Sequence, residues 1–432
     1  MKSDLPKTTL VIFGVTGDLS QRYLLPALAE ICRSSSFNAE LQILGISRRP
    51  ISASEVLSDK TVNLAKQLRT YQMDYGAPAA YQKLKNDLAG QNPAQVIFYF
   101  AVPPAAVLPI VGQLGAAGLN GPHYKLLMEK PFGTDLASAQ ALIEAIGQYF
   151  KEDQVFRIDH YLAKEMAQNI AVFLGGNALF REIWNNKFID KIELVAQESI
   201  GIEGRGHFYE QTGALRDIVQ SHLLQLAALT LMEPCPNVFD FSQVQARRLA
   251  ALRDLQAEPA SVVKGQYQGY RQEAGNPSSN VETFVWLSLK STDPKWQGVP
   301  VQLITGKKLN QKLTEIRVYF KKSQSAQANL LRLRIQPKEG IELELWVKKP
   351  GYGQDLQKVP LDFSYQQHFD KLPDAYEQVI VDAVRSRANL FASSGEVLAS
   401  WQILQPLLDK WDDYGLKSYP PGATTETILK IT

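Results

Sequence analysis

The stretch Thr8-Thr-Leu-Val-Ile-Phe-Gly-Val-Thr-Gly-Asp-Leu19 joins an apolar run to a glycine turn, and a helical pattern then continues to Ile31. Its apolar, β-branched first half is typical of a strand buried in a parallel sheet. A strand, a turn at Gly14 and Gly17, and a helix N-terminus together make a site for a pyrophosphate. The usual fingerprint has three glycines, and Ile12 occupies the first of these positions. A plain strand-to-helix turn is therefore the alternative.

A second apolar run, residues 41–46, ends in Ser47 and is followed by Arg48 and Arg49. In dinucleotide-binding sheets an acidic residue near this point binds the ribose 2′-hydroxyl of NAD, whereas arginine suits the 2′-phosphate of NADP. The sequence therefore favours NADP, with NAD as the alternative cofactor. Two solvated loop arginines are the competing interpretation.

Further strands and helices alternate through the first third of the chain. Residues 95–101 and 124–128 are apolar and strand-like, while 105–117 and 135–150 show helical patterns. This alternation predicts a doubly wound parallel sheet. Lys130 follows one of these strands, where a cation could contact both cofactor and substrate, although a solvated loop lysine has the same local pattern.

The stretch Arg157-Ile-Asp-His-Tyr-Leu-Ala-Lys-Glu-Met-Ala-Gln-Asn169 begins as the end of a strand and continues as a helix. Asp159 and His160 lie at the turn, where parallel sheets present their chemistry. If the helix starts there, His160 and Lys164 are four residues apart on one face and could bind one anion. A capped helix start with solvated charges is the alternative.

The pattern changes beyond residue 160. Successive strand-like segments predict a large, mostly antiparallel sheet and hence an α+β domain; they are residues 191–198, 282–289, 299–305, 314–320, 330–335 and 341–347. We therefore expect two domains, residues 1–159 and 160–432. Residues 373–386 and 394–411 read as helices that close the second domain.

Residues 212–231 form a helical pattern that is apolar on most sides, so this helix should be buried. His222 lies in its middle, and Arg216 and Asp217 lie in its first turns. A buried histidine needs a hydrogen-bond partner, and a structural role in the core is its usual explanation. A catalytic role is the alternative.

Composition narrows the class of protein. The 432 residues carry a net charge of +2, which gives no basis for nucleic-acid binding, and include two Cys and five scattered His, which form no evident metal-ligand cluster. No apolar run approaches the roughly 18 residues of a membrane span. Cys32 and Cys235 fit a reducing compartment, so we expect a cytoplasmic enzyme.

Several blocks together carry a resemblance. Asp159-His-Tyr-Leu-x-Lys-Glu165 and Arg216-Asp-x-x-Gln-x-His222 closely resemble the signatures of glucose-6-phosphate dehydrogenases. Trp296-x-Gly-Val-Pro300 followed by Thr305-Gly-Lys-x-Leu-Asn310 is similar to the same family. Glu129-Lys-Pro131 resembles both this family and a broader class of sugar oxidoreductases, in which the proline is typically cis.

The resemblance implies a Rossmann-type NADP-binding domain and a role for each matching residue. The general base would be His222, oriented by Asp159. Residues around the substrate phosphate would be His160, Tyr161, Lys164, Lys307 and Lys312. Residues contacting sugar hydroxyls would be Lys130, Glu198 and Asp217. Residues binding NADP would be Gly14, Val15, Thr16, Gly17, Asp18, Leu19, Arg48, Ala101 and Lys130.

The implied reaction is oxidation of D-glucose 6-phosphate to 6-phospho-D-glucono-1,5-lactone, the first step of the oxidative pentose phosphate pathway. A neutral histidine can take the proton while hydride leaves for the cofactor, and no metal is needed. The resemblance also implies a homodimer, or a dimer of dimers, formed through the free face of the second sheet. The partners expected are glucose 6-phosphate and NADP, with neither nucleic acid nor membrane.

The chain departs from the family pattern in two ways. It is shorter than the family, chiefly within 51–95, between His222 and Lys307, and near the C-terminus. Ser20-Gln-Arg-Tyr23 replaces a lysine-rich continuation after the glycine turn. An oxidoreductase acting on another sugar or sugar phosphate, or a non-catalytic relative, remains the alternative function.

Overall fold

The computed structural model describes residues 5–35, 37, 40–235, 237, 240–322 and 327–431. The chain divides into two compact units. The first comprises Met1–Gly133, Ala137–Ala163 and Pro373–Ser394, and the second Thr134–Leu136, Lys164–Leu372 and Gly395–Thr432. The division after Ala163 lies close to the expected boundary. The expected second domain, however, contains a segment that clusters with the first unit.

The first unit is built on a seven-stranded sheet with the order β16-β6-β5-β4-β1-β2-β3. The strands are β1 (Thr8–Phe13), β2 (Leu41–Ser47), β3 (Leu68–Gln72), β4 (Gln95–Phe100), β5 (Tyr124–Met128), β6 (Val155–Ile158) and β16 (Phe391–Ala392). All neighbours pair in parallel except β16, which runs antiparallel to β6. The predicted parallel sheet is confirmed.

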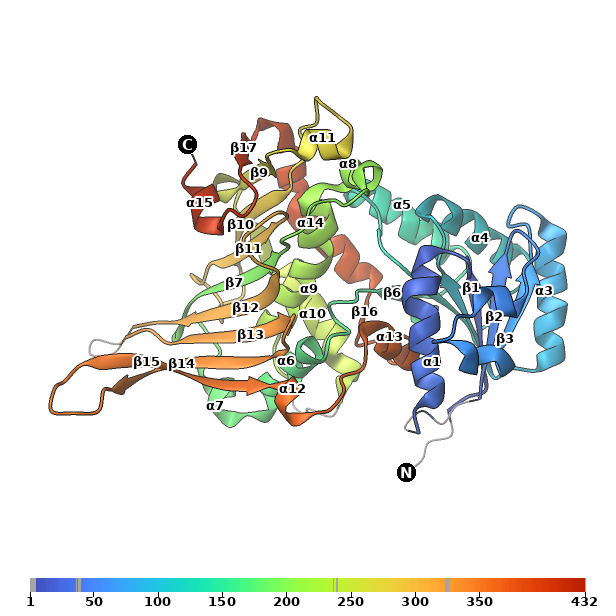
Figure 1. Cartoon of the computed structure of the whole chain (residues 1–432), viewed down its shortest axis with the longest axis horizontal. Helices are drawn as coiled ribbons and strands as arrows, with labels where there is room; N and C mark the ends of the chain where they lie inside the picture. Colours follow the sequence, from blue (N-terminus) through green and yellow to red (C-terminus); the bar gives the residue numbers. More distant parts are fainter. Residues whose placement is uncertain are drawn as a thin grey trace. The chain divides into compact units, whose positions relative to one another are not determined.

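Helices cover both faces of this sheet (Figure 1). They are η1 (Ser20–Leu24), α1 (Leu25–Arg33), α2 (Ala53–Val56), η2 (Val62–Lys66), α3 (Pro78–Gln91), α4 (Pro104–Ala116), α5 (Leu136–Gly147), η3 (Glu152–Gln154) and α13 (Ala375–Val384). One buried cluster joins α1 and α13 to the sheet, and a second joins α3 and α4 to its other face. This two-sided burial explains why β1 and β4 are apolar throughout.

Buried polar contacts tie α13 to the first unit, although it comes late in the sequence. The Gln95 side chain donates to the carbonyl of Val384 at 2.8 Å. Lys125 donates to Gln95 and to the Ser386 hydroxyl, each at 2.5 Å. Burial lowers the pKa of Lys125 to about 8. The helix predicted over residues 373–386 is present as α13, Ala375–Val384, but its packing on the first sheet was not foreseen.

The second unit is built on a ten-stranded sheet with the order β15-β14-β13-β12-β7-β11-β10-β9-β17, and β8 pairs with β10 beside this path. The strands are β7 (Ile189–Gln197), β8 (Leu255–Ala257), β9 (Val263–Tyr267), β10 (Phe284–Ser291), β11 (Val301–Gly306), β12 (Leu313–Phe320), β13 (Leu330–Gln336), β14 (Gly340–Lys348), β15 (Leu356–Ser364) and β17 (Leu416–Tyr419). Among the described strands of this sheet, β7 with β11 and β9 with β17 pair in parallel, and the other neighbours pair antiparallel. The expected mostly antiparallel sheet is confirmed.

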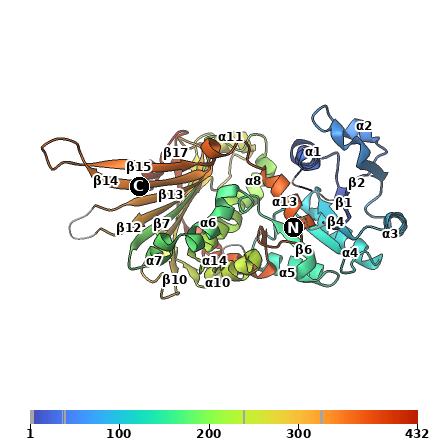
Figure 2. The ribbon, with the colours of Figure 1, turned by 90° about the horizontal axis from the view of Figure 1, so that it is seen from below.

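Several helices of the second unit gather on one face of this sheet (Figure 2). The full set of helices described in the second unit is α6 (Glu165–Gly176), α7 (Ala178–Ile183), α8 (Gly206–Ala214), η4 (Leu215–Leu223), α9 (Leu224–Leu231), η5 (Phe241–Gln243), α10 (Val244–Arg253), η6 (Pro259–Ser261), α11 (Tyr270–Ala274), α12 (Tyr365–His368), α14 (Ser394–Leu408), η7 (Trp411–Asp413) and α15 (Thr425–Leu429). In the described part of the chain, no helix is both long and apolar enough to cross a membrane.

Candidate active site

A cavity of about 630 Å³ opens at the carboxyl ends of β1, β2 and β4 in the first unit. Its walls come from the loops that follow these strands. The lining residues are Gly14, Thr16, Gly17, Ser47, Arg48, Arg49, Tyr75, Ala101, Val102, Pro103 and Ala106. This is the edge where parallel sheets bind dinucleotides.

The glycine turn depends on a close approach of two loops. Gly14 has a φ of 86°, and a Cβ atom there would overlap the carbonyl oxygen of Ala101. The Ser20 hydroxyl and the Gly17 N–H both donate to the Gly14 carbonyl, at 2.9 and 3.0 Å. Only glycine combines this φ with this contact.

Two arginines and a tyrosine complete the wall of the cavity. Arg48, predicted from the sequence, lines it together with Arg49 and Tyr75, which were not predicted as site residues. Burial raises the pKa of Tyr75, while a hydrogen bond with the Gly14 backbone and the charge of Arg48 oppose that rise. The tyrosine therefore lies beside both the glycine turn and the arginine.

Of the predicted cofactor residues in the glycine turn, three lie outside this wall. Val15 is fully buried and belongs to the core. Asp18 forms an exposed ion pair with Arg22 at 2.7 Å, and Leu19 packs against the same core as Val15. These side chains support the turn, and the cavity itself is lined by Gly14, Thr16, Gly17, Arg48 and Ala101 of the predicted set.

The strand ends of β5 and β6 carry the other predicted residues of the first unit. Lys130 follows β5, and the peptide bond between Lys130 and Pro131 is cis, as expected. Asp159 follows β6 and is buried, and its carboxylate accepts the Tyr161 N–H at 2.9 Å. The rings of His160 and Tyr161 lie 5.1 Å apart.

The helix predicted to start beside Asp159 begins later, at Glu165. Residues 160–164 form turns, so the argument that placed His160 and Lys164 on one helical face is wrong. The Glu339 carboxylate accepts the N–H of Met166 at 2.7 Å and so satisfies the first turn of α6. Burial raises the pKa of Glu339, and the charge of Lys164 opposes that rise.

In the second unit, the parallel pairing of β7 and β11 brings two predicted residues together. Gln197 lies opposite Gly306 at the carboxyl ends of these strands, so the next residues, Glu198 and Lys307, are adjacent. They form an ion pair in which Lys307 is buried. The Lys307 ammonium also lies 5.2 Å from the centre of the Tyr209 ring.

Tyr209 links this ion pair to a third predicted residue. Burial raises the pKa of its phenol, and the charges of Asp217 and Glu198 act in the same direction. Asp217 therefore lies within electrostatic reach of the same ring as Glu198 and Lys307. Tyr209 was not predicted, because a tyrosine in a helical stretch gives no local sign of a site.

His222 is buried in η4, and the start of this helix is fixed by a carboxylate distant in sequence. The Leu215 N–H donates to Glu282 at 2.9 Å, and the Trp411 indole donates to the same side chain at 3.2 Å. An acidic group at a helix N-terminus is favourable. The predicted helix 212–231 is interrupted at Gly213, whose φ of 61° breaks the helical backbone near the end of α8.

Lys312 lies between β11 and β12 and is exposed. Among the described residues, no group of three or more His, Cys, Asp or Glu could hold a metal ion. The second unit thus pairs Glu198 with Lys307 beside Tyr209, and the charge of Asp217 acts on the phenol of the same tyrosine. Asp159, His160, Tyr161 and Lys130 belong to the first unit.

The fold and the residues define a class of protein. The parallel sheet, the glycine turn and the arginine-lined cavity fit a nicotinamide dinucleotide, and the second unit supplies a buried histidine, carboxylates and a lysine. This combination is that of a nicotinamide-dependent oxidoreductase.

Comparison with known proteins gives the family. Residues 11–169 match the family described as "Glucose-6-phosphate dehydrogenase, NAD binding domain", and residues 171–428 match "Glucose-6-phosphate dehydrogenase, C-terminal domain". The chain belongs to the glucose-6-phosphate dehydrogenase family.

Individual relatives are similar to this chain over nearly its full length. Glucose-6-phosphate 1-dehydrogenase of Mycolicibacterium smegmatis is 37% identical, with 95% of this chain and 93% of the relative covered. The Chlamydia muridarum enzyme is 35% identical over 94% and 90% of the two chains. A solved glucose-6-phosphate dehydrogenase in complex with its substrate glucose-6-phosphate is 30% identical, with a TM-score of 0.91 over 99% and 98% of the chains.

Proposed function

We propose that this protein oxidises D-glucose 6-phosphate to 6-phospho-D-glucono-1,5-lactone with hydride transfer to NADP, the first step of the oxidative pentose phosphate pathway. The observation that carries the proposal is the match of both halves of the chain to one enzyme family. The two sets of site residues, one in each unit, supply the chemistry that the reaction needs.

The reaction removes a proton from the C1 hydroxyl oxygen and a hydride from C1 itself. In the proposed mechanism, neutral His222 takes the proton from the C1 hydroxyl as the hydride leaves C1. The nicotinamide supplies the hydride acceptor when bound. We propose that Asp159 orients the imidazole and stabilises its protonated form, which is the usual role of a carboxylate beside a catalytic histidine.

The remaining polar residues would position the sugar. We propose that Glu198, Asp217 and Lys130 contact its hydroxyls. The proposed phosphate contacts are His160, Tyr161, Lys164, Lys307 and Lys312, of which Lys307 is buried and paired with Glu198. Fixing the distant phosphate would place C1 for reaction.

The cavity in the first unit supports NADP as the cofactor. Arg48 and Arg49 line the wall that also contains Gly14 and Gly17. We propose that the glycine turn binds the pyrophosphate through backbone N–H groups and that the arginines bind the 2′-phosphate. NAD has an uncharged 2′-hydroxyl in place of the 2′-phosphate and would lack the charged contacts with the arginines, so NAD would bind less tightly.

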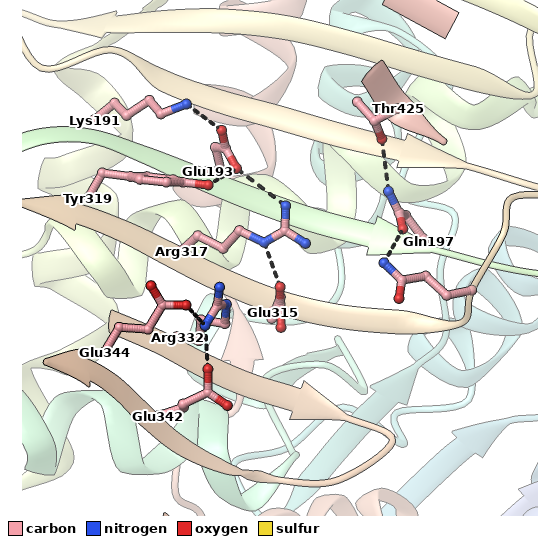
Figure 3. Close-up of polar contacts among 11 residues, drawn as sticks. Lys191, Glu193, Gln197, Glu315, Arg317, Tyr319, Arg332, Glu342, Glu344 and Thr425 are labelled. Atoms are coloured by element: carbon pink, nitrogen blue, oxygen red, sulfur yellow. Dashed lines mark hydrogen bonds and ion pairs between the residues drawn. The ribbon is translucent and has the colours of Figure 1, made fainter. Parts of the chain in front are cut away.

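We further propose a homodimer, or a dimer of dimers, formed through the sheet face that carries the charged side chains of β7, β12, β13 and β14 (Figure 3). Arg317 contacts Glu315 at 2.5 Å and Glu193 at 3.4 Å, while Arg332 contacts Glu344 at 2.7 Å. Because these charges are already paired, a second copy would cover them at a lower desolvation cost than unpaired charges would carry. Light scattering would test the oligomeric state.

The proposed compartment is the cytoplasm. Cys32 and Cys235 are both free thiols, which fits a reducing environment.

The proposed function is tested by following NADPH absorbance with purified protein, glucose 6-phosphate and NADP. Parallel reactions contain unphosphorylated glucose, other sugar phosphates, or NAD. We expect activity only with glucose 6-phosphate, and a higher rate with NADP than with NAD. Activity on another sugar would support the alternative oxidoreductase. Folded protein that is inactive with every substrate would support a non-catalytic relative.

A further inference from the structure

Lys307 directly follows β11, and its backbone is held from two sides. Its N–H donates to the Thr283 carbonyl at 2.9 Å, and its carbonyl accepts the Tyr419 hydroxyl at 2.7 Å. Tyr419 is completely buried in the second unit, in the same core cluster as Tyr209. These contacts fix the point from which the lysine side chain starts.

The ammonium at the far end of this side chain contacts a carboxylate and an aromatic ring. It forms the ion pair with Glu198 and lies over the Tyr209 ring, 5.2 Å from the ring centre. The Lys307 side chain is 4% exposed, whereas that of Glu198 is 33% exposed. The carboxylate of the pair is therefore partly open to solvent, while the ring that meets the ammonium is buried.

The Tyr209 ring is fixed by two further tyrosines. It packs edge-to-face on Tyr270 with centres 6.1 Å apart, and Tyr270 packs in the same way on Tyr267 at 5.4 Å. The hydroxyls of Tyr270 and Tyr267 donate to Glu210 and Glu273, at 2.6 and 2.7 Å. The Tyr209 hydroxyl is buried and has no hydrogen-bond partner among the described residues. Tyr209 therefore acts on its surroundings through its ring.

The face of an aromatic ring attracts a cation through the quadrupole of the ring, without taking a directed hydrogen bond as a carboxylate does. A lysine ammonium carries three N–H donors. Glu198 accepts from this ammonium, and the ring attracts its charge as a whole. The arrangement holds the charge in place and leaves N–H donors for the oxygen atoms of a ligand.

We propose that Tyr209 is a positioning residue whose ring holds the Lys307 ammonium in place for the phosphate of the substrate. The inference rests on the proposed function, in which Lys307 contacts that phosphate. It adds a residue that does not touch the substrate and acts only through the lysine. The hydroxyl group of Tyr209 has no part in this role.

Two substitutions separate the ring from the hydroxyl. Tyr209→Leu removes the ring and should raise the KM for glucose 6-phosphate about tenfold, because a desolvated cation–π contact has this magnitude. The KM for NADP and the kcat should change less than about twofold, since the contact serves substrate binding alone. Tyr209→Phe removes only the hydroxyl and should keep the wild-type KM values.

Tyr124→Leu is the control for the loss of a buried tyrosine. Tyr124 stands at the start of β5, at the opposite edge of the first sheet from the cavity, and its ring stacks on Phe98 at 5.7 Å. This variant should lose stability in urea and keep the KM for glucose 6-phosphate.

Trifluorinated phenylalanine at position 209 tests the ring with little change of shape, and so serves if Tyr209→Leu does not fold. Fluorine withdraws the electron density that attracts the cation. The KM for glucose 6-phosphate should lie about threefold above that of Tyr209→Phe. Equal KM values for the two rings would overturn the inference.

The closing experiment is a double-mutant cycle that combines Tyr209→Leu with Lys307→Met. If the ring acts through the ammonium, its removal should have no further effect on the KM for glucose 6-phosphate once the ammonium is gone. The same rise in both backgrounds would overturn the role of Tyr209 alone, because the ring would then act through general packing. If wild-type protein neither binds nor oxidises glucose 6-phosphate, the proposed function fails and this inference fails with it.

Discussion

The cavity of the first unit and the polar cluster of the second are assembled in different ways. The cavity is built largely from backbone and from short loops that directly follow strands, such as the turn at Gly14 and Gly17. The cluster is built from side chains far apart in the chain, since Glu198 pairs with Lys307 across 109 residues. A site of the first kind can be recognised in a local stretch, whereas one of the second kind depends on the whole fold.

The largest effect expected in either region is that of His222→Asn in the second. General acid–base catalysis contributes about 10²- to 10⁴-fold, so kcat should fall by about 10³-fold. Calorimetry should show that glucose 6-phosphate still binds. His207→Asn is the control, because His207 is exposed on α8 and should leave kcat unchanged. A normal kcat in the His222 variant would show that the base lies elsewhere.

Gly213→Ala should cause the largest loss of stability. The added Cβ would overlap the Glu282 carboxylate, and the φ of 61° disfavours any side chain. We expect urea unfolding to give a loss of about 3 kcal/mol. Gly204→Ala separates the two causes, since Gly204 has a φ of 77° and no atoms where its Cβ would lie. Equal losses in both variants would mean that the contact with Glu282 is unimportant.

Lys307→Met tests whether the long-range ion pair serves the substrate. Methionine keeps the length of the side chain but leaves Glu198 without its partner, and the KM for glucose 6-phosphate should rise about 30-fold. The KM for NADP should change little. Lys308→Met, at the next position, provides the control. A larger effect on the NADP constant than on the sugar constant would contradict the proposed division of roles between the units.

Arg48→Ala should have the smallest of these effects, and it acts on the local region. Loss of one surface cation near the cofactor phosphate should raise the KM for NADP about tenfold and leave that for NAD nearly unchanged. Arg33→Ala, in the exposed ion pair of α1 with Glu30, is the control. An equal change in the KM for NADP and the KM for NAD would show that Arg48 does not bind the 2′-phosphate.

The sequence predicted the local region well and the long-range contacts poorly. The glycine turn and Arg48 stand in one strand–turn–helix–strand pattern, so their place at the sheet edge could be predicted. Arg49 also lines the cavity and shares the local pattern of Arg48, whereas nothing in the local pattern of Tyr75 distinguishes it from a solvated loop residue.

The features that were not predicted depend on contacts between segments far apart in the sequence. The packing of α13 on the first sheet depends on Gln95 and Lys125, which appear in the sequence only as polar residues of buried strands. The late start of α6 depends on Glu339, which lies 173 residues from Met166. The residue types at these positions are compatible with several hydrogen-bond partners, and which partner is used depends on the folded structure.

The central claim is that hydride passes from C1 of glucose 6-phosphate to the nicotinamide. The most direct test is to supply glucose 6-phosphate carrying deuterium at C1, together with unlabelled NADP, and to analyse the NADPH by mass spectrometry. One deuterium in each NADPH molecule is the predicted result. NADPH that forms without deuterium would contradict the account, because the hydride would then come from another atom.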